Sequence, residues 1–264
     1  MALAVVLLVA SPHGVLSTGK HKQEKKEKIA RKVYITNDPV SAGVFNELTK
    51  AVISSTKNLE DLSFQVKIVK SNPKVLQKLK NDFMPLKGMR RASVWYKPPK
   101  IKVEVKVGSM TLTEKSDGIK RSLSVRPLRY KKNESSDERE SASLLDAYFG
   151  LLTENIWQNY VVKSASRAQD GRSENCTVCF SLGNKTSGSH NCVIDMSDMK
   201  LLKINQYDSS GVLQAKYVYS DHKRYCDGFW VPRHIDIYNA KSELAASVEY
   251  VDIKVNAGIR DSIF

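Results

Sequence analysis

Apolar and polar residues alternate most regularly in the last part of the chain, residues 199–264. A period of two is the pattern of a strand with one buried face. Turn-forming residues separate the alternating stretches, among them Asp208-Ser209-Ser210-Gly211 and Cys226-Asp227-Gly228. Strands are therefore predicted at 200–207, 212–220, 229–238 and 243–255. Because such short turns force neighbouring strands to run antiparallel, these strands form a meander.

A helical period marks the residues that follow Asn37-Asp38-Pro39. Asp38 suits the N-cap of a helix, and Pro39 suits its first position. The helix is predicted to end near Lys57, and its single apolar face should pack on a sheet. That face consists of Val40, Val44, Phe45, Leu48 and Val52. A strand follows at 59–69, with Leu62, Phe64, Val66 and Ile68 on its buried side.

The middle of the chain predicts further hairpins. Residues 70–91 break the alternation and are interpreted as an insertion that holds a short helix. Two strands, 92–96 and 101–107, come next; in the second, Ile101, Val103, Val105 and Val107 alternate with lysine or glutamate. The chain continues through 110–112, turns at Asp117-Gly118 and returns over 119–130. Residues 131–140 are polar or charged and predict an exposed loop.

A second long helix is predicted after Ser143, which forms a capping-box pattern with Asp146. Its broad apolar face consists of Leu144, Leu145, Tyr148, Phe149, Leu152 and Ile156. Residues 160–207 predict more strands. The balance, about ten strands and two long helices, indicates a mainly β (α+β) protein with one curved antiparallel sheet. Helices laid against the concave side of such a sheet permit an elongated apolar cavity.

Short motifs in the carboxy-terminal third carry a resemblance. They are Tyr207-Asp208…Gly211, then Trp230-Val231-Pro232, then Tyr250-Val251-Asp252-Ile253…Asn256…Ile259…Phe264. In this order and spacing they resemble the LolA-like family of bacterial outer-membrane lipoprotein-sorting proteins. The resemblance implies a half-open barrel with helices as a lid over an apolar cavity that holds acyl chains. It also implies a periplasmic carrier that receives lipoproteins from an inner-membrane release complex and delivers them to an outer-membrane acceptor.

Two sets of site residues follow from this resemblance. The cavity is expected to be lined by Trp95, Ile101, Val103, Val105, Val107, Leu145, Phe149 and Leu152. Trp95-Tyr96-Lys97-Pro98 resembles an aromatic strand of the family that ends in Arg-Pro, where the arginine bonds backbone groups of the lid. Lys97 is therefore the lid-latch candidate, although lysine lacks the planar five-donor fork of arginine. The alternative for Lys97 is an ordinary exposed lysine at a strand end.

The formal net charge is +14, and it is unevenly distributed. Residues 20–32 hold seven basic and two acidic residues, and residues 67–106 hold twelve basic and two acidic residues. The basic residues favour either a solvated surface or contact with an anionic membrane surface or an acidic partner. Nucleic acid is not an expected partner, because the basic stretches lack interleaved aromatic stacking platforms.

The amino terminus resembles an export signal. Residues 1–17 carry no Lys, Arg, Asp or Glu and include an apolar run at 3–10, with Val15 and Ser17 at positions that suit signal-peptidase cleavage. The alternative is a buried amino-terminal strand. The predicted organisation is a signal peptide at 1–17, a basic flexible tail at 18–36 and one lipoprotein-binding domain at 37–264, located in the periplasm.

The chemistry of the chain offers few catalytic candidates. Its four cysteines are Cys176, Cys179, Cys192 and Cys226. In an exported protein they favour structural disulfides, with zinc binding or a dithiol at Cys176-x-x-Cys179 as alternatives. The sequence lacks the H-E-x-x-H, G-x-S-x-G and phosphate-loop motifs. We expect no enzyme, cofactor or metal; the alternatives to a carrier are a lipid sensor or envelope regulator and an exported thiol enzyme.

Overall fold

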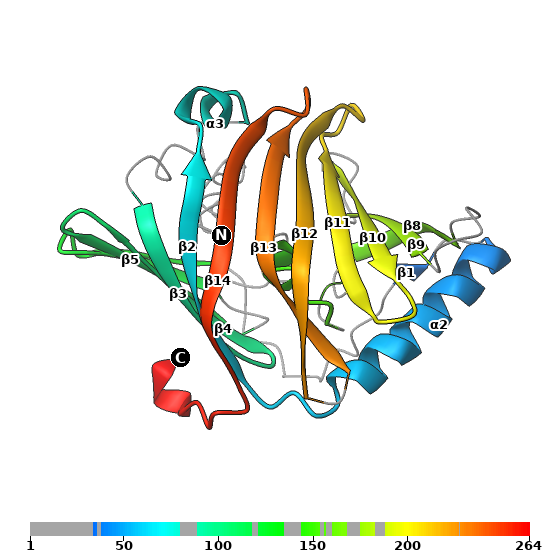
Figure 1. Ribbon diagram of the computed structural model, residues 1–264, viewed down its shortest axis with the longest axis horizontal. Helices are drawn as coiled ribbons and strands as arrows, with labels where there is room; N and C mark the ends of the chain where they lie inside the picture. The colour runs from blue at the N-terminus through cyan, green and yellow to red at the C-terminus, as the bar shows by residue number, and fades with distance from the viewer. Residues whose placement is uncertain are drawn as a thin grey trace, which may run out of the picture.

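A computed structural model describes the protein (Figure 1). The residues that it describes are 34–35, 38–79, 89–117, 121–134, 144–153, 156, 160–167, 175–182, 188–226 and 228–264. The predicted signal peptide and nearly all of the basic tail lie outside them. Among the described residues, no helix is both long and apolar enough to cross a membrane.

One sheet of 14 strands makes up most of the structure. Its strands in chain order are β1 (Tyr34–Ile35), β2 (Leu62–Ser71), β3 (Met89–Lys97), β4 (Lys100–Val107), β5 (Met110–Ser116), β6 (Arg121–Arg126), β7 (Tyr130–Glu134), β8 (Tyr160–Arg167), β9 (Asn175–Leu182), β10 (Ser189–Asp195), β11 (Lys200–Tyr207), β12 (Leu213–Tyr225), β13 (Phe229–Asn239) and β14 (Leu244–Val255).

The sheet is built from two meanders that meet in its middle. Strands β8 to β14 pair in chain order, as do β2 to β7, and the antiparallel pair β14–β2 joins the two runs. The other pairs are antiparallel as well, except the parallel pair β1–β8. The order is linear, with β1 and β7 at its ends, so the sheet is a curved, half-open barrel. Figure 1 shows β8 and β9 passing behind the strands that face the viewer.

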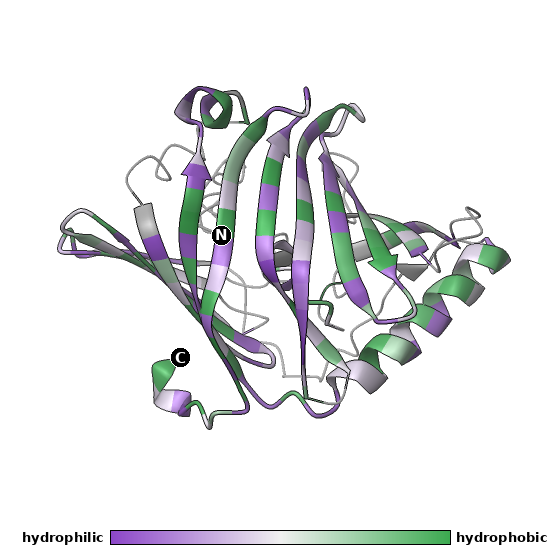
Figure 2. Ribbon diagram, viewed as in Figure 1, coloured by the Kyte–Doolittle hydropathy of each residue, from purple (hydrophilic) through white to green (hydrophobic). Residues whose placement is uncertain are grey.

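Alternation along the strands separates a dry face from a wet face. Figure 2 shows hydrophobic and hydrophilic bands alternating along β2 and β12–β14. In β4, for example, Ile101, Val103 and Val105 are buried and their neighbours are not. Most buried apolar residues of these strands belong to one continuous hydrophobic cluster. The sequence prediction of a mainly β protein with one curved sheet is confirmed.

The first helix forms as predicted but with a shifted face. Helix α2 (Pro39–Thr56) is capped by Asp38, whose side chain accepts from two backbone N–H groups. It packs mainly against β8. Val40 is 73% exposed, whereas Ser41 is buried, so the apolar face begins one residue later than the sequence indicates. Position 40 lies in the first turn of the helix.

Two further predictions need correction. Helix α4 (Leu144–Tyr148) is five residues long, not a second long helix, because Gly150 adopts a positive φ of 71° that ends the helix. Residues 131–134, at the start of the predicted exposed loop, belong to strand β7, since they pair with β6. The predicted short helix in the insertion is confirmed as α3 (Pro73–Leu79), which packs on β13 and β14. Ser143 lies outside the described residues.

The carboxy-terminal segment is fixed by one buried carboxylate. Asp61 is 2% exposed and accepts hydrogen bonds from the backbone N–H groups of Ala257 (2.9 Å), Gly258 (2.9 Å) and Ile259 (2.8 Å). The Asn256 side chain bonds backbone groups just before β2, including the Asn58 carbonyl at 2.8 Å. The Asn256…Ile259 motif thus ties the end of the chain to the start of β2. The short 3-10 helix η4 (Asp261–Ile263) follows.

We predict that Asp61→Asn lowers the free energy of unfolding by about 1.5–3 kcal/mol, the scale of hydrogen bonds to a charged group. The amide keeps the shape but loses the charge and one acceptor oxygen. Urea denaturation measures the change. Glu60→Ala, at the exposed neighbouring acid, is the matched control and should stay within about 0.5 kcal/mol. Equal effects of the two substitutions would contradict the anchoring role of Asp61.

Candidate functional site

The concave face of the sheet carries the predicted cavity residues of β4. Ile101, Val103 and Val105 are 3%, 1% and 4% exposed. In register they lie opposite Tyr96, Val94 and Ala92 of β3, which are buried as well. Val107 is half-buried and packs against the same cluster. This wall of β3 and β4 is apolar except for the hydroxyl group of Tyr96.

Trp95 lies on the opposite, outer face. Its ring is contacted by the Lys102 ammonium, 4.8 Å from the ring centroid. Because side chains alternate along a strand, Tyr96 takes the concave position and Trp95 cannot. This placement corrects the expectation that Trp95 lines the cavity.

The segment 146–153 covers the concave face. Phe149 is fully buried, and its ring meets that of Phe64 edge-on at 5.8 Å between centroids. Leu151 and Leu152 are also buried. Phe149 and Leu152 were predicted to line the cavity; the structure places both on the segment that fills the concave side. The side chain of Leu145 lies outside the described residues. We call residues 146–153 the cover segment.

Tyrosine hydroxyls from three strands hold the cover segment. Tyr219 of β12 donates to the Ala147 carbonyl at 2.8 Å, and Tyr250 of β14 donates to the Phe149 carbonyl at 3.2 Å. Tyr96 of β3 donates to Asp146 at 3.1 Å. Burial raises the pKa of Tyr219 and of Tyr250 well above the ordinary value, so both hydroxyls remain protonated donors. Satisfied polar groups of this kind allow backbone to lie inside an apolar core.

Asp146 has a different role from the helix cap that its position predicts. It is 3% exposed, and besides the bond from Tyr96 it accepts one from the Thr153 hydroxyl at 2.6 Å. Asp146 therefore links the two ends of the cover segment to the sheet. The carboxylate is retained in the core because hydroxyl donors surround it.

A second polar contact joins the cover segment to β10. The Tyr148 hydroxyl and His190 Nε2 are 3.0 Å apart, and both residues are buried. Burial lowers the pKa of His190 to about 4, so the imidazole is neutral near neutral pH. The sequence analysis missed this pair and the anchoring tyrosines. Tyrosines at concave positions of otherwise apolar strands were the available signal.

Glycine is required at position 150 for two reasons. Its φ is +71°, a conformation that other residues adopt with strain. A Cβ there would also lie 2.5 Å from Pro232 Cγ and 2.6 Å from Tyr219 Cδ1. The cover segment therefore meets the sheet at van der Waals distance where the Trp230-Val231-Pro232 motif passes beneath it.

Lys97 binds the carboxy-terminal segment. Its ammonium donates to the Ile259 carbonyl at 3.2 Å and lies 3.3 Å from the Asp261 carboxylate. Lys100 reaches the same carboxylate at 3.3 Å, and hydrogen bonds from Lys100 and then Lys97 lower the pKa of Asp261. Lys97 thus bonds a backbone carbonyl, as a latch would, but the carbonyl belongs to residue 259 and not to a helical lid.

No disulfide joins any two of the four cysteines, all of which lie within the described residues, so the expected disulfide is not formed. Cys176 and Cys179 are three residues apart on β9, which puts them on opposite faces and about 10 Å apart along the strand. Cys192 of β10 lies opposite Val178 of β9, and Val178 is one residue from Cys179 and two residues from Cys176. Cys226 comes directly after the end of β12. A disulfide needs Cα atoms within about 7 Å and Cβ atoms that point toward each other. Burial raises the pKa of the Cys176 and Cys179 thiols, which does not favour a catalytic dithiol.

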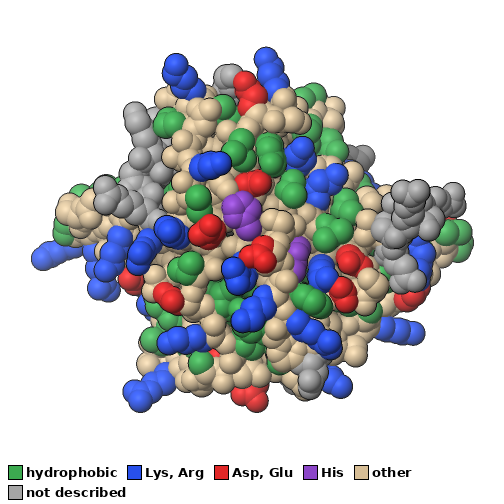
Figure 3. Space-filling model, viewed as in Figure 1, with side chains coloured by type: hydrophobic (Ala, Val, Ile, Leu, Met, Phe, Trp, Pro, Cys, Tyr) green, Lys and Arg blue, Asp and Glu red, His purple; other side chains and the backbone are tan. Residues whose placement is uncertain are grey.

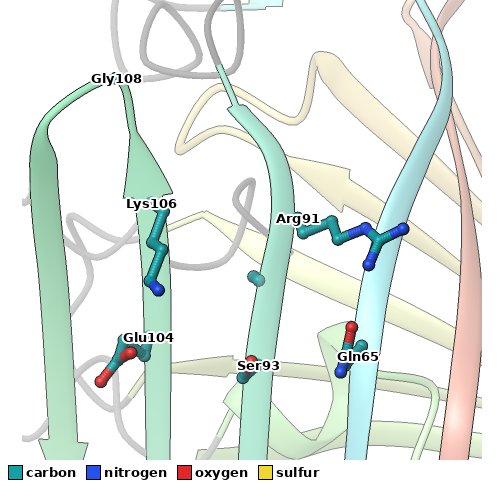
Figure 4. Close-up of a pocket in the computed structure, with 7 residues that line it drawn as sticks. Gln65, Arg91, Ser93, Glu104, Lys106 and Gly108 are labelled. Atoms are coloured by element: carbon teal, nitrogen blue, oxygen red, sulfur yellow. The ribbon is translucent and has the colours of Figure 1, made fainter.

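Among the described residues, no group of three or more His, Cys, Asp or Glu side chains could hold a metal ion. A cleft of about 700 Å³ on the outer face of β2–β4 is polar, lined among others by Gln65, Ser93 and Glu104. Figure 4 shows Arg91 extending from β3 toward β2, and Lys106 on β4 beside Glu104. Its charged and amide side chains do not suit an acyl chain.

No family model matches the sequence, and no curated protein matches it. Solved structures do. A LolA superfamily protein from Nitrosomonas europaea superposes with a TM-score of 0.55 at 14% identity, covering 85% of this chain and 96% of that one. A DUF1329 family protein from Desulfovibrio piger superposes with a TM-score of 0.55 at 12% identity, covering 86% of this chain and 98% of that one. A domain from Vibrio parahaemolyticus, described as an outer membrane lipoprotein-sorting protein domain, superposes with a TM-score of 0.51 at 11% identity. The match covers 81% of this chain and 94% of that one.

These similarities extend over nearly the whole length of each solved chain and agree with the resemblance seen in the sequence motifs. At such low identity they establish the architecture and not a specific activity. The protein has the LolA-like fold, a half-open β-barrel with its apolar face turned inward.

Proposed function

We propose that the protein is a non-enzymatic carrier that binds lipid acyl chains on its concave face. The observation that carries this proposal is the cover segment: an apolar surface is closed by a short piece of chain held through side-chain hydroxyls. Such a cover can leave without breaking the sheet, because its hydrogen bonds to Tyr219 and Tyr250 involve none of the strand ladders. The exposed face would then match an acyl chain in chemistry.

The energies of cover and ligand are comparable. An acyl chain of about fourteen methylenes gains about 11 kcal/mol of gross transfer free energy. Displacing the cover loses hydrogen bonds worth about 0.5–1.5 kcal/mol each and uncovers Phe149, Leu151 and Leu152, at about 1.5–3 kcal/mol per side chain. The two totals are of the same order. Binding is therefore reversible, as delivery to an acceptor requires.

The finer proposal is that the cargo is a lipoprotein. The LolA-like fold and the lipoprotein-sorting description of one solved neighbour support it. On this proposal the protein is exported, collects lipoproteins from an inner-membrane release complex and transfers them to an outer-membrane acceptor. Mass spectrometry of protein purified from the envelope tests it. Co-purifying lipoprotein or diacylated lipid is expected, and protein recovered only from the cytoplasm without lipid would contradict it.

Removing single hydroxyls should weaken the cover and strengthen lipid binding. Tyr219→Phe and Tyr250→Phe each delete one donor and keep the ring. We expect the affinity for a fluorescent fatty acid to rise about two- to tenfold, because the closed state loses about 0.5–1.5 kcal/mol. Fluorescence titration of the purified protein measures the change.

Tyr217→Phe is the matched control on the same strand. The Tyr217 hydroxyl is buried and has no hydrogen-bond partner among the described residues. Its removal should leave probe affinity unchanged. If all three variants bind the probe like the wild type, the hydroxyls do not govern access to the concave face.

Gly150→Ala should strain the closed form selectively. The added Cβ would overlap Pro232 and Tyr219, so the melting temperature of lipid-free protein should fall by several degrees. With lipid bound, the cover is displaced and the loss should shrink. Gly211→Ala is the control: Gly211 also has a positive φ, 80°, but a Cβ there would meet none of the described residues within 4 Å. An equal, lipid-independent loss in both variants would argue against displacement of the cover.

A further inference from the structure

The outer face of β5, β6 and β7 gathers cations around hydroxyl groups. In register, Lys115 lies opposite Ser122, and Ser124 lies opposite Lys131. Arg126 is on the same face as Ser124, two residues along β6. Directly opposed side chains have Cβ atoms about 4.5–5.5 Å apart, and diagonal neighbours are about 7–8 Å apart. Long cationic side chains at these positions can therefore converge on one point.

A cleft of about 840 Å³ opens at this place. Its polar lining comprises Lys115, Ser122, Ser124, Arg126, Arg129 and Lys131, and among the described residues that line it there is no Asp or Glu. Tyr130, Pro127 and Phe264 form an apolar side of the same cleft. The Lys115 ammonium donates to an oxygen of Phe264 at 2.7 Å, so one cleft cation already binds an acceptor oxygen.

The charges that act on Lys115 are of its own sign. Partial burial, followed by the charges of Lys102, Arg126 and Lys131, lowers the pKa of Lys115. Lys102 is also directly opposite Lys115 across the β4–β5 pair. Like charges opposed across a sheet are destabilising. An anion held between them would relieve this repulsion.

The other half of the outer face is arranged differently. There, Arg233 pairs with Asp221 at 3.0 Å, and Lys200 contacts both Asp198 and the ring of Trp230. Lys216 lies over the Tyr238 ring at 4.7 Å. Figure 3 shows Lys and Arg interleaved with Asp and Glu over β11–β14, and Lys and Arg gathering on the side where β3–β5 lie. The unbalanced cleft is thus a local feature and not a property of the whole surface.

We propose that the β5–β7 cleft binds a phosphate group. Arginine forks, lysine ammonium groups and serine hydroxyls together supply the donors that phosphate oxygens accept. The apolar side formed by Pro127 and Tyr130 leaves room for the organic part of a phosphate ester. A nucleic acid strand fits less well, because among the described lining residues Tyr130 and Phe264 alone are aromatic. The phosphate can belong to a soluble compound or to a phospholipid headgroup.

The test uses the full chain and two kinds of ligand. Calorimetric titration with inorganic phosphate examines the free anion. Co-sedimentation with vesicles of phosphatidylcholine, with and without phosphatidylglycerol, examines the headgroup. The double variant Arg126→Gln/Lys131→Gln removes two cations of the cleft. The charge-matched control is Lys216→Gln/Lys223→Gln, which removes two lysines of β12 whose ammonium groups lie over tyrosine rings.

We expect wild-type protein to bind inorganic phosphate, anionic vesicles or both. The cleft variant should lose at least about tenfold in affinity, the scale of one lost charge-assisted contact, while the control changes less than about twofold. Binding of phosphate alone assigns the site to a soluble compound, and binding of vesicles alone assigns it to a headgroup. No binding to either, equal loss in both variants, or tighter binding of single-stranded DNA that the cleft variant abolishes would each overturn the proposal.

The cleft and the concave face are on opposite sides of the sheet, so the two proposals fail independently. Fatty-acid probe affinity of the cleft variant should equal that of the wild type. Arg126, Lys131 and Lys223 are exposed and Lys216 is half-buried, and melting curves should confirm that both double variants fold.

Discussion

Burying a stretch of backbone in an apolar concavity is the constraint on which this structure depends. Carbonyl groups of the cover segment lie where water cannot solvate them, so each needs a donor from the sheet. Tyrosine is suited to supply it, since the ring remains in the apolar layer while the hydroxyl reaches beyond it. Tyr219 and Tyr250 use this property from different strands. On the carrier proposal, the cover segment leaves the concave face when lipid binds, and water then replaces those donors.

The position of the cover depends on the sheet being continuous through its middle. The pair β14–β2 joins residues far apart in the chain, with Tyr250 opposite Val66. Asp61 and Asn256 secure one end of this pair by binding backbone groups across it. The two meanders therefore form one curved surface, and residues from both, such as Tyr96 and Tyr219, reach the same short segment.

The two faces of the sheet have separate chemistry. The concave face is apolar with a few buried hydroxyls, and the outer face carries most of the charge. Within the outer face, the half formed by β11–β14 balances its cations with carboxylates and rings, whereas the cleft on β5–β7 does not. A protein that holds acyl chains inside and phosphate groups outside would contact both parts of a lipid, and each contact would use its own side of the sheet.

The sequence by itself determined most strands and their facing, because period-two alternation records which side chains are dry, although it missed β7 and turned Trp95 inward. It indicated β4 with Ile101, Val103 and Val105 inward, and it placed the helix start at Asp38. Only the tertiary structure decided what meets those faces. Leu152 and Phe149 look helical in sequence, yet Gly150 ends the helix and they fill the barrel. The partners of Asp61, Lys97 and Tyr96 are 50 to 198 residues away, and such contacts depend on strand order, which local patterns do not encode.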